Sequence, residues 1–305
     1  MPTDAGVTVV IPTHNRPQLM QRALESVLTQ DYPGEIEAVV VFDACEPFDP
    51  PVEVPPGRSV RTTVNTRTRG LAGARNTGIL AATQEYVAFL DDDDFWFPGK
   101  LKAQMPLFDN EPRPVLVATA MLYDDGERPY ERLVPKDVVE YKDLLRDRVA
   151  GIPSGAFVME KSQLLGELGM VDEEIPGSYG EDYDMMLRAA YLAPIPVVNR
   201  PYVSVTWARN SYYFGRWGLY ADALEFLLRK HPDFESDAKG YGRVAGQIAF
   251  ARAANGERKT ARTWVKRSLT HDKTQIRAWL ALAVALRLLP ARFVIRTVQR
   301  MGKGI

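Results

Sequence analysis

Cysteine and long hydrophobic runs are scarce in this sequence. Cys45 is the only cysteine among the 305 residues, and there are three histidines. An internal disulfide and a cysteine-ligated zinc site are therefore excluded. The longest apolar run, residues 278–286, is less than half as long as the roughly 20 residues that a membrane-spanning helix needs. Residues 1–6 are too few and too polar for a secretory signal, so we expect a cytoplasmic protein.

The composition is that of an ordinary globular protein. Hydrophobic residues make up 46% of the chain and charged residues 25%, which excludes a collagen, a disulfide scaffold and a wholly disordered chain. At about 150 residues per domain, the length allows one large domain or two modest ones.

Positive charge is concentrated at the end of the chain. The formal net charge is −1, but residues 257–305 hold twelve Lys or Arg and two Asp or Glu, so this stretch carries +10 and the remainder −11. Such a tail predicts contact with an anionic partner. The alternative is a solvated basic face of a helix.

Apolar segments and turn signals predict an α/β sheet in the first part of the chain. Apolar runs predict buried strands at 7–11 and 36–42, and a third and a fourth strand are predicted at 60–65 and 86–90. Helical spacing between them predicts helices at 17–30 and 70–83. Further elements are expected up to about residue 210: strands at 115–122, 156–160 and 197–207, and helices at 98–108, 161–168 and 182–192. The polar stretch 124–148 is expected to be a surface excursion.

The pattern changes after about residue 214. Only helices are predicted there, at 214–230, 240–255, 257–269 and 274–289. We therefore predict two domains, an α/β domain at 1–210 and a helical region at 211–305. In the last part, residues 277–300 combine an apolar face with Arg287, Arg292, Arg296 and Arg300. Such a helix can lie on an anionic membrane, or its apolar face can pack on the first domain or on a partner subunit.

Four adjacent carboxylates, Asp91, Asp92, Asp93 and Asp94, follow the predicted strand at 86–90. Like charges at this spacing disfavour joint ionisation, and a divalent cation removes the conflict. Mg²⁺ and Mn²⁺ prefer oxygen ligands and bind through one or two carboxylates together with substrate phosphates. Ligands of open α/β sheets also bind at the carboxyl ends of strands. The alternative is a solvated acidic turn.

The segment 70–78 begins with Gly70 and contains Arg75 in a run of small residues. Small residues let a helix start approach a sheet or a ligand closely, and a helix N-terminus favours anions. Arg75 is suited to pair with a carboxylate or a phosphate. A helix that simply packs tightly through Ala and Gly explains the segment equally well.

Two further acidic positions are candidates. Glu181 and Asp182 precede an amphipathic helix, where they are either a source of a general base or capping residues in the first turn. Asp43 follows the second apolar strand, where a carboxylate can accept a hydrogen bond from a bound base or ribose. A loop acid without such a role is the alternative for Asp43.

Together these features resemble family 2 glycosyltransferases of the GT-A fold, over about residues 5–210. Six segments carry the resemblance in the family's order: 9–16, 40–43, 70–78, 89–94 with Trp96, Pro98, Lys100 and Leu101 after it, 169–173, and 181–188. The resemblance implies a Rossmann-like mixed sheet flanked by helices. It also implies a nucleotide-sugar donor and inversion at the anomeric carbon.

The resemblance assigns roles to single residues. Asp93 matches the direct metal ligand for Mn²⁺ or Mg²⁺, Asp91 or Asp92 the ribose contact, and Asp182 the catalytic base. Glu181 and Trp96 match the acceptor and base segment. The remaining donor-binding residues are expected to be Pro12, Thr13, Asn15, Arg16, Asp43, Gly70 and Arg75, with Arg209 as a candidate diphosphate contact or a structural salt bridge.

The sequence also departs from the family's pattern. Residues 42–45 read Phe-Asp-Ala-Cys where many members have Asp-Asp-Gly-Ser, so UDP is favoured as the donor nucleotide while dTDP and GDP stay open. The processive members' Gln-x-x-Arg-Trp motif is incomplete, since only Arg216 and Trp217 are present. We expect transfer of one or a few sugars to a glycan, a lipid-linked or a small-molecule acceptor.

Several rival functions remain at this stage. They are transfer to a secondary metabolite, nucleotidyl transfer, and a catalytically dead nucleotide-sugar-binding protein. We expect no nucleic-acid partner, and homo-oligomer formation stays open. Peripheral contact with the inner face of the cell membrane, through the basic C-terminal helices, is a further expectation.

Overall fold

A computed structural model describes residues 2–206 and 215–300 of the chain. By their contacts the residues form two compact units. The first comprises residues 1–144, 149–173 and 181–209, and the second residues 145–148, 174–180 and 210–305. The segments 145–148 and 174–180, which the sequence placed in the α/β domain, are therefore grouped by their contacts with the helical unit.

The first unit is built on one sheet of ten strands. Its main path runs β3-β2-β1-β4-β9-β6-β10-β5, while β7 pairs with β6 and β8 with β10. The strands are β1 Val7–Thr13, β2 Ile36–Phe42, β3 Arg58–Val64, β4 Tyr86–Phe89, β5 Phe95–Trp96, β6 Leu116–Asp124, β7 Tyr130–Arg132, β8 Val138–Val139, β9 Val158–Glu160 and β10 Ile195–Thr206. Strands β3, β2, β1 and β4 are parallel, and β9 runs antiparallel to β4 and β6, so the sheet is mixed.

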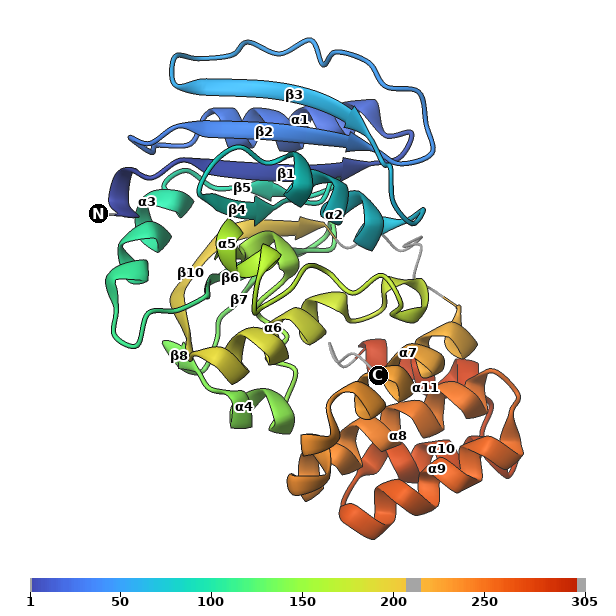
Figure 1. Cartoon of the computed structure of the whole chain (residues 1–305). Helices are drawn as coiled ribbons and strands as arrows, with labels where there is room; N and C mark the ends of the chain where they lie inside the picture. The colour runs from blue at the N-terminus through green and yellow to red at the C-terminus, as the bar shows by residue number, and fades with distance from the viewer. Residues whose placement is uncertain (1, 207–214, 301–305) are drawn as a thin grey trace. The chain divides into compact units, whose positions relative to one another are not determined.

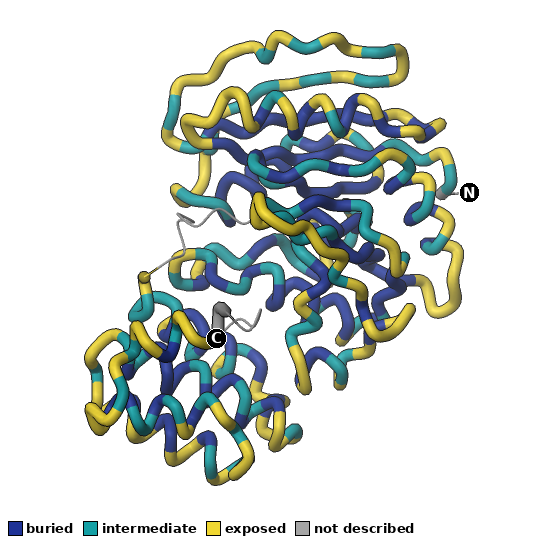
Figure 2. Tube along the Cα trace, turned by 180° about the vertical axis from the view of Figure 1, so that it is seen from behind, coloured by how far each residue is buried: buried dark blue, intermediate teal, exposed yellow. Residues whose placement is uncertain are grey.

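Burial follows the sequence pattern of the strands. Every residue of β1 and β2 is buried, as expected for apolar runs that are covered on both faces. The edge strand β3 alternates between exposed and half-buried residues, which Figure 2 shows as a lighter strand beside the dark centre of the sheet. Because β1 pairs in parallel with β2 and with β4, the carboxyl ends of these three strands lie together at one edge of the sheet.

Helices cover both faces of this sheet (Figure 1). In the first unit they are α1 Pro17–Leu28, α2 Leu71–Ala81, α3 Lys100–Gln104, α4 Tyr141–Arg146 (its last two residues in the second unit), α5 Lys161–Leu165 and α6 Glu181–Leu192. Helix α2 approaches β1 closely, because a Cβ at Gly78 would lie 2.1 Å from Cγ1 of Val10. The predicted α/β fold, with a mixed sheet between helices and a helical C-terminal region, is confirmed.

The stretch 124–148 is more ordered than the sequence suggested. It holds the short elements β7, β8 and α4, and β7 and β8 extend the sheet beside β6 and β10. These strands have two or three residues each, too few for a period of two to be recognised.

The described residues of the second unit form helices joined by short connections, and none of them lies in a strand. Its helices are α7 Trp217–Lys230, α8 Ala238–Ala254, α9 Arg258–His271, α10 Ile276–Ala285 and α11 Ala291–Arg300. The stretch 277–300, taken from the sequence as one helix, is therefore two helices. The chain turns between Leu286 and Pro290, because proline cannot continue a helix. None of the described helices has the length and hydropathy to cross a membrane.

Candidate active site

A first cluster lies where the parallel strands β1 and β4 end. The hydroxyl of Thr13 donates to Oδ2 of Asp92 at 2.8 Å. Nη1 of Arg16 donates to Oδ1 of Asp92 at 3.1 Å and to Oδ2 of Asp93 at 2.9 Å. Neighbouring parallel strands bring these residues together across more than 75 positions of sequence. The structure thus joins four of the predicted donor and metal residues in one cluster.

A second cluster is organised by Arg75 of α2. The Arg75 side chain is 1% exposed. Its Nη2 donates to Oδ1 of Asp91 at 2.6 Å and to Oγ of Ser154 at 2.7 Å, and its Nη1 donates to Oε1 of Glu181 at 2.7 Å. A buried guanidinium is stable only when it is paired in this way. The sequence allowed a carboxylate or a phosphate as the partner of Arg75, and in the structure Arg75 pairs with the carboxylates of Asp91 and Glu181.

A third cluster fixes the beginning of α2. The two carboxylate oxygens of Asp43 accept hydrogen bonds from Nδ2 of Asn65 at 2.8 Å and from the backbone N–H of Gly70 at 3.0 Å. Gly70 precedes α2 with a φ of +119°, a conformation that favours glycine. Each carboxylate oxygen has a second lone pair, so Asp43 can still accept a hydrogen bond from a ligand.

The four aspartates are electrostatically strained. Burial, followed by repulsion from Asp91 and Asp92, raises the pKa of Asp93 to about 6. Burial also raises the pKa of Asp92, against the hydrogen bond from Thr13 and the charge of Arg16. Asp94 is buried, its pKa is raised well above the usual range, and its Oδ1 accepts from the backbone N–H of Thr206 at 2.9 Å. A cation at this position would relieve the repulsion.

The aspartate block fits only a metal site that the protein completes in part, with substrate phosphates supplying the other ligands. Within residues 2–206 and 215–300, no group of three or more His, Cys, Asp or Glu side chains is arranged to hold a metal ion. Mg²⁺ and Mn²⁺ bind through one or two carboxylates when substrate phosphates complete the coordination. The carboxylate of Asp93 offers hard oxygen atoms to such a site, and its role as the metal ligand stays a prediction.

The start of α6 forms the other side of the site. Burial, then repulsion from Asp182, raises the pKa of Glu181 to about 7, although the charge of Arg75 opposes the shift. The next residue, Asp182, is half-buried, and its Oδ1 accepts from the backbone N–H of Tyr183 at 2.7 Å. Arg75 therefore ties the aspartate block to the turn that carries the predicted base.

Glu181→Gln is expected to flatten the dependence of stability on pH. The pKa of Glu181 is raised on folding, so its contribution is complete below about pH 4.5 and is lost as the pH rises to about 7. Over this range the free energy of unfolding of the wild type should fall by up to about 3 kcal/mol more than that of the variant. Urea unfolding followed by circular dichroism measures both, and parallel curves would contradict the prediction.

The comparisons with known proteins agree with this geometry. A family model described as "Glycosyl transferase family 2" matches residues 8–169, slightly more than half of the chain. The chain belongs to glycosyl transferase family 2. The match includes the clusters around Arg16 and Asp43, and it ends before Glu181 and Asp182.

Curated relatives of this family 2 member are distant. Pre-mycofactocin glycosyltransferase of Mycobacterium tuberculosis is 29% identical over 245 residues, which are 76% of this chain and 49% of that protein. UDP-Glc:alpha-D-GlcNAc-diphosphoundecaprenol beta-1,3-glucosyltransferase WfgD of Escherichia coli is 30% identical over 104 residues, 34% of this chain and 41% of that protein. The chain spans about half to three fifths of the length of the first curated relatives that it matches.

A solved structure has the same fold. Residues 1–349 of S. aureus TarS, crystallised with UDP-GlcNAc, align with a TM-score of 0.56 and 18% identity, covering 97% of this chain and 92% of that one. At this identity the likeness supports the fold alone.

Trp96 does not lie where an acceptor could touch it. The side chain is buried at 2% exposure, and its indole N–H donates to the carbonyl oxygen of Gly155 at 2.9 Å. The ammonium group of Lys100, also buried, lies 3.9 Å from the ring centroid of Trp96. In this family 2 chain Trp96 therefore packs the core beneath the site, which corrects its placement in the acceptor segment.

Three other predicted residues have different outcomes. Pro12 is buried within β1, so its side chain helps to form the strand end. Asn15 is exposed in the turn after β1 with a φ of +54°, and its Nδ2 contacts Nε2 of His14 at 3.3 Å. Arg209 lies outside the described residues, and its role stays a prediction.

Sequence reasoning assigned no individual role to two residues that hold the site together, Ser154 and Glu173. Ser154, a partner of Arg75, stands in an undistinguished loop sequence, and no pattern marks it. Glu173 accepts from Asn76 at 2.7 Å and from the backbone N–H of Thr68 at 3.2 Å, and pairs with Arg67. Burial opposes the shift, but these hydrogen bonds lower the pKa of Glu173 to about 2. The family resemblance included the segment 169–173, which contains Glu173, but it gave no role for this side chain.

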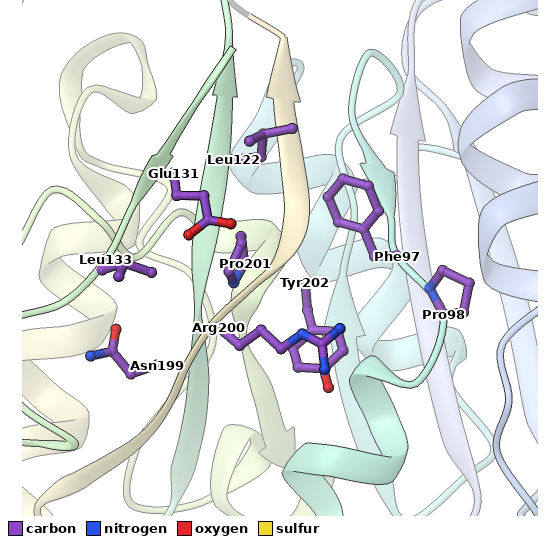
Figure 3. A pocket seen from close by; sticks show the side chains of 9 residues that line it. All are labelled: Phe97, Pro98, Leu122, Glu131, Leu133, Asn199, Arg200, Pro201 and Tyr202. Atoms are coloured by element: carbon purple, nitrogen blue, oxygen red, sulfur yellow. The ribbon is translucent and has the colours of Figure 1, made fainter.

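A hollow of about 530 Å³ lies elsewhere in the first unit, over β6, β7 and β10 (Figure 3). The Arg200 guanidinium stacks over the ring of Tyr202 at 5.3 Å, and Phe97 and Glu131 also line the hollow. None of the predicted site residues lines it. The candidate active site is instead the strand-end region defined by Arg16, Arg75 and Asp43.

Proposed function

We propose that this family 2 member is an inverting, divalent-metal-dependent glycosyltransferase that moves a sugar from a nucleotide-diphosphate donor to a hydroxyl acceptor. The main support for the proposal is that Arg75 forms two ion pairs, one with Asp91 at 2.6 Å and one with Glu181 at 2.7 Å. They join the strand end suited to a nucleotide diphosphate with the turn that presents Asp182.

The donor would lie across the ends of β1, β2 and β4. Asp43 would accept a hydrogen bond from the base, and Asp91 or Asp92 from the ribose. Asp93 would hold the Mn²⁺ or Mg²⁺ ion, which supplies positive charge to stabilise the leaving diphosphate. Arg16, now between Asp92 and Asp93, is placed to turn its guanidinium toward a diphosphate oxygen once a cation takes its place.

Asp182 would act on the acceptor. Its carboxylate would take the proton from the acceptor hydroxyl as the oxygen attacks the anomeric carbon. The bond between that carbon and the diphosphate oxygen breaks with the electron pair leaving on the nucleoside diphosphate. One base without a protein nucleophile accounts for a single displacement, and hence for inversion.

The donor and acceptor classes are drawn from relatives. UDP-sugars are favoured because the name of one sequence relative specifies UDP-Glc as its donor, while dTDP and GDP remain alternatives. A lipid-linked or glycan acceptor in surface polysaccharide assembly is favoured by the diphosphoundecaprenol relative. The pre-mycofactocin relative, which matches 76% of this chain, favours a small-molecule acceptor as the second candidate.

A thermal-shift panel of UDP, GDP, dTDP and CDP, each with and without Mn²⁺, tests the donor site. A nucleotide present at 100 times its dissociation constant should stabilise the fold by about 2.7 kcal/mol, which raises the melting temperature by a few degrees. We expect one nucleotide to do so in a Mn²⁺-dependent manner. Asp93→Asn should abolish the Mn²⁺-dependent part of the shift.

Asp31→Asn is the matched control, because Asp31 forms an exposed ion pair with Lys102 at 3.1 Å away from the strand ends. It should keep the full shift. The absence of a shift with all four nucleotides would contradict the proposed donor site. A Mn²⁺-dependent shift that survives Asp93→Asn would remove Asp93 as the metal ligand.

A further inference from the structure

The second unit exposes large apolar side chains on α10, α11 and the turn between them. Four of these side chains are more than half exposed: Ile276 71%, Leu288 71%, Phe293 58% and Trp279 52%. Leu286, at 48%, lies beside them in sequence, and we call these five residues the α10–α11 surface. Exposed apolar side chains that are grouped, rather than scattered singly, mark interaction sites.

An ordinary surface helix buries its large apolar side chains. Helix α10 instead exposes two of its large apolar side chains and buries mainly alanines. Its buried residues are Ala278, Ala281, Val284 and Ala285, so three of the four are alanines. Ile276 and Trp279, one turn apart, are exposed instead. Packing of α10 against α8 and α9 therefore uses mainly the alanines and leaves Ile276 and Trp279 outside.

The turn after α10 holds this arrangement in place. Arg287 adopts a φ of +63°, and the backbone N–H of Leu288 donates to the carbonyl oxygen of Ala283 at 2.9 Å. The N–H of Phe293 donates to the carbonyl oxygen of Pro290 at 3.0 Å, which starts α11. Leu288 and Phe293 are thus presented by hydrogen-bonded backbone.

The charge around the surface indicates its partner. Within the part of the chain that the structure describes, the guanidinium groups of Arg287, Arg292 and Arg296 form no hydrogen bond or ion pair. The sequence from 273 to 305 contains no acidic residue. A second copy of the chain would bring the same positive charges against these, so self-association through this surface is disfavoured.

We propose that the α10–α11 surface docks on an anionic lipid bilayer. Its apolar side chains would enter the acyl boundary, and the three arginines would lie at the level of the lipid phosphates. A hollow of about 380 Å³ adjoins the surface and is lined by Arg258 and Arg287 together with the turn residues Leu289 and Pro290. Two arginines at one hollow suit a phosphate-bearing headgroup. The proposal does not rest on the proposed glycosyl transfer.

Co-sedimentation of the full chain with vesicles tests the proposal. Vesicles of phosphatidylcholine alone should bind little protein, and vesicles with added phosphatidylglycerol should bind it in a salt-sensitive manner. The triple variant Arg287→Gln/Arg292→Gln/Arg296→Gln should weaken the partition coefficient about 100-fold, since each basic residue near the surface contributes about one factor of five.

The matched control removes the same charge from α9, by Lys259→Gln, Arg262→Gln and Lys266→Gln, three residues that are all exposed. This variant should lose much less than the α10–α11 variant. An equal loss of vesicle binding in both triple variants would mean that binding depends on net charge alone. That result would overturn the proposal that the α10–α11 surface is the docking site. Equal binding of wild type to both kinds of vesicle would overturn the anionic partner.

A labelled residue locates the contact. Leu288→Cys in a Cys45→Ala background carries one thiol for an environment-sensitive NBD dye, and Leu165→Cys on α5, 52% exposed, is the control position. Anionic vesicles should shift the emission of the dye at 288 to the blue and leave the dye at 165 unchanged. A blue shift at 288 without vesicles, together with a dimer on size-exclusion chromatography, would assign the surface to self-association and overturn the proposal.

Discussion

Asp182→Asn is expected to lower the turnover rate about 100- to 10,000-fold while leaving donor affinity unchanged. The amide keeps the size of the side chain but cannot take the acceptor's proton. In free energy this loss corresponds to about 3–5 kcal/mol of the activation barrier. Donor affinity should not change, because Asp182 is proposed to act on the acceptor and none of the proposed donor contacts involves its side chain.

The experiment needs two readouts. Release of nucleoside diphosphate in the presence of an acceptor panel gives the rate, and calorimetric titration of the donor nucleotide with Mn²⁺ gives the affinity. Asp184→Asn is the matched control on the same helix. Asp184 is fully buried and its Oδ2 accepts from Nε of Arg188 at 2.9 Å, so this change should lower stability and leave the rate per folded molecule within a few-fold. Wild-type turnover in Asp182→Asn would remove it as the base.

The sheet was predictable because its central strands β1 and β2 are mostly apolar, with Thr8, Thr13 and Glu37 as the exceptions. A run such as Val7–Thr13 without alternation specifies a strand that is covered on both faces, and two such strands with a helix between them specify parallel pairing. The position of the aspartates directly after β4 then placed them at the carboxyl edge. These conclusions depend on local sequence and on a small set of connection rules.

The partners within the site were not predictable in the same way. Arg75 was recognised as a candidate, but its hydrogen bond to Ser154 joins residues 79 positions apart, and nothing in the sequence around 154 marks a polar partner. Trp96 was misplaced because its neighbours in the motif are site residues, whereas a strand end turns successive side chains toward opposite faces. The helix predicted at 274–289 ended before Pro290, but the basic and apolar pattern of residues 277–300 was also taken as one helix, which the break between α10 and α11 corrects.

Arg75→Met is expected to produce the largest loss of stability among single changes in the site. The variant leaves Asp91 and Glu181 without the guanidinium that pairs them, and breaking a buried ion pair from one side costs about 3–5 kcal/mol. The loss should be larger at pH 8 than at pH 5, because the pKa of Glu181 is about 7 and its carboxyl group is neutral at the lower pH. Urea unfolding at the two pH values measures this difference.

Two companion variants make this result interpretable. Lys102→Met removes an exposed cation that pairs with Asp31, and it should change the free energy of unfolding by less than about 1 kcal/mol. In the double variant Arg75→Met/Glu181→Gln, the second change removes the carboxylate that the first leaves unpaired, so part of the stability should return at pH 8 and little at pH 5. A loss below 1 kcal/mol for Arg75→Met at pH 8 would contradict this argument. The link from the aspartate block to α6 would then not depend on Arg75, and the position of Asp182 would have to be maintained by the packing of α6 against β10.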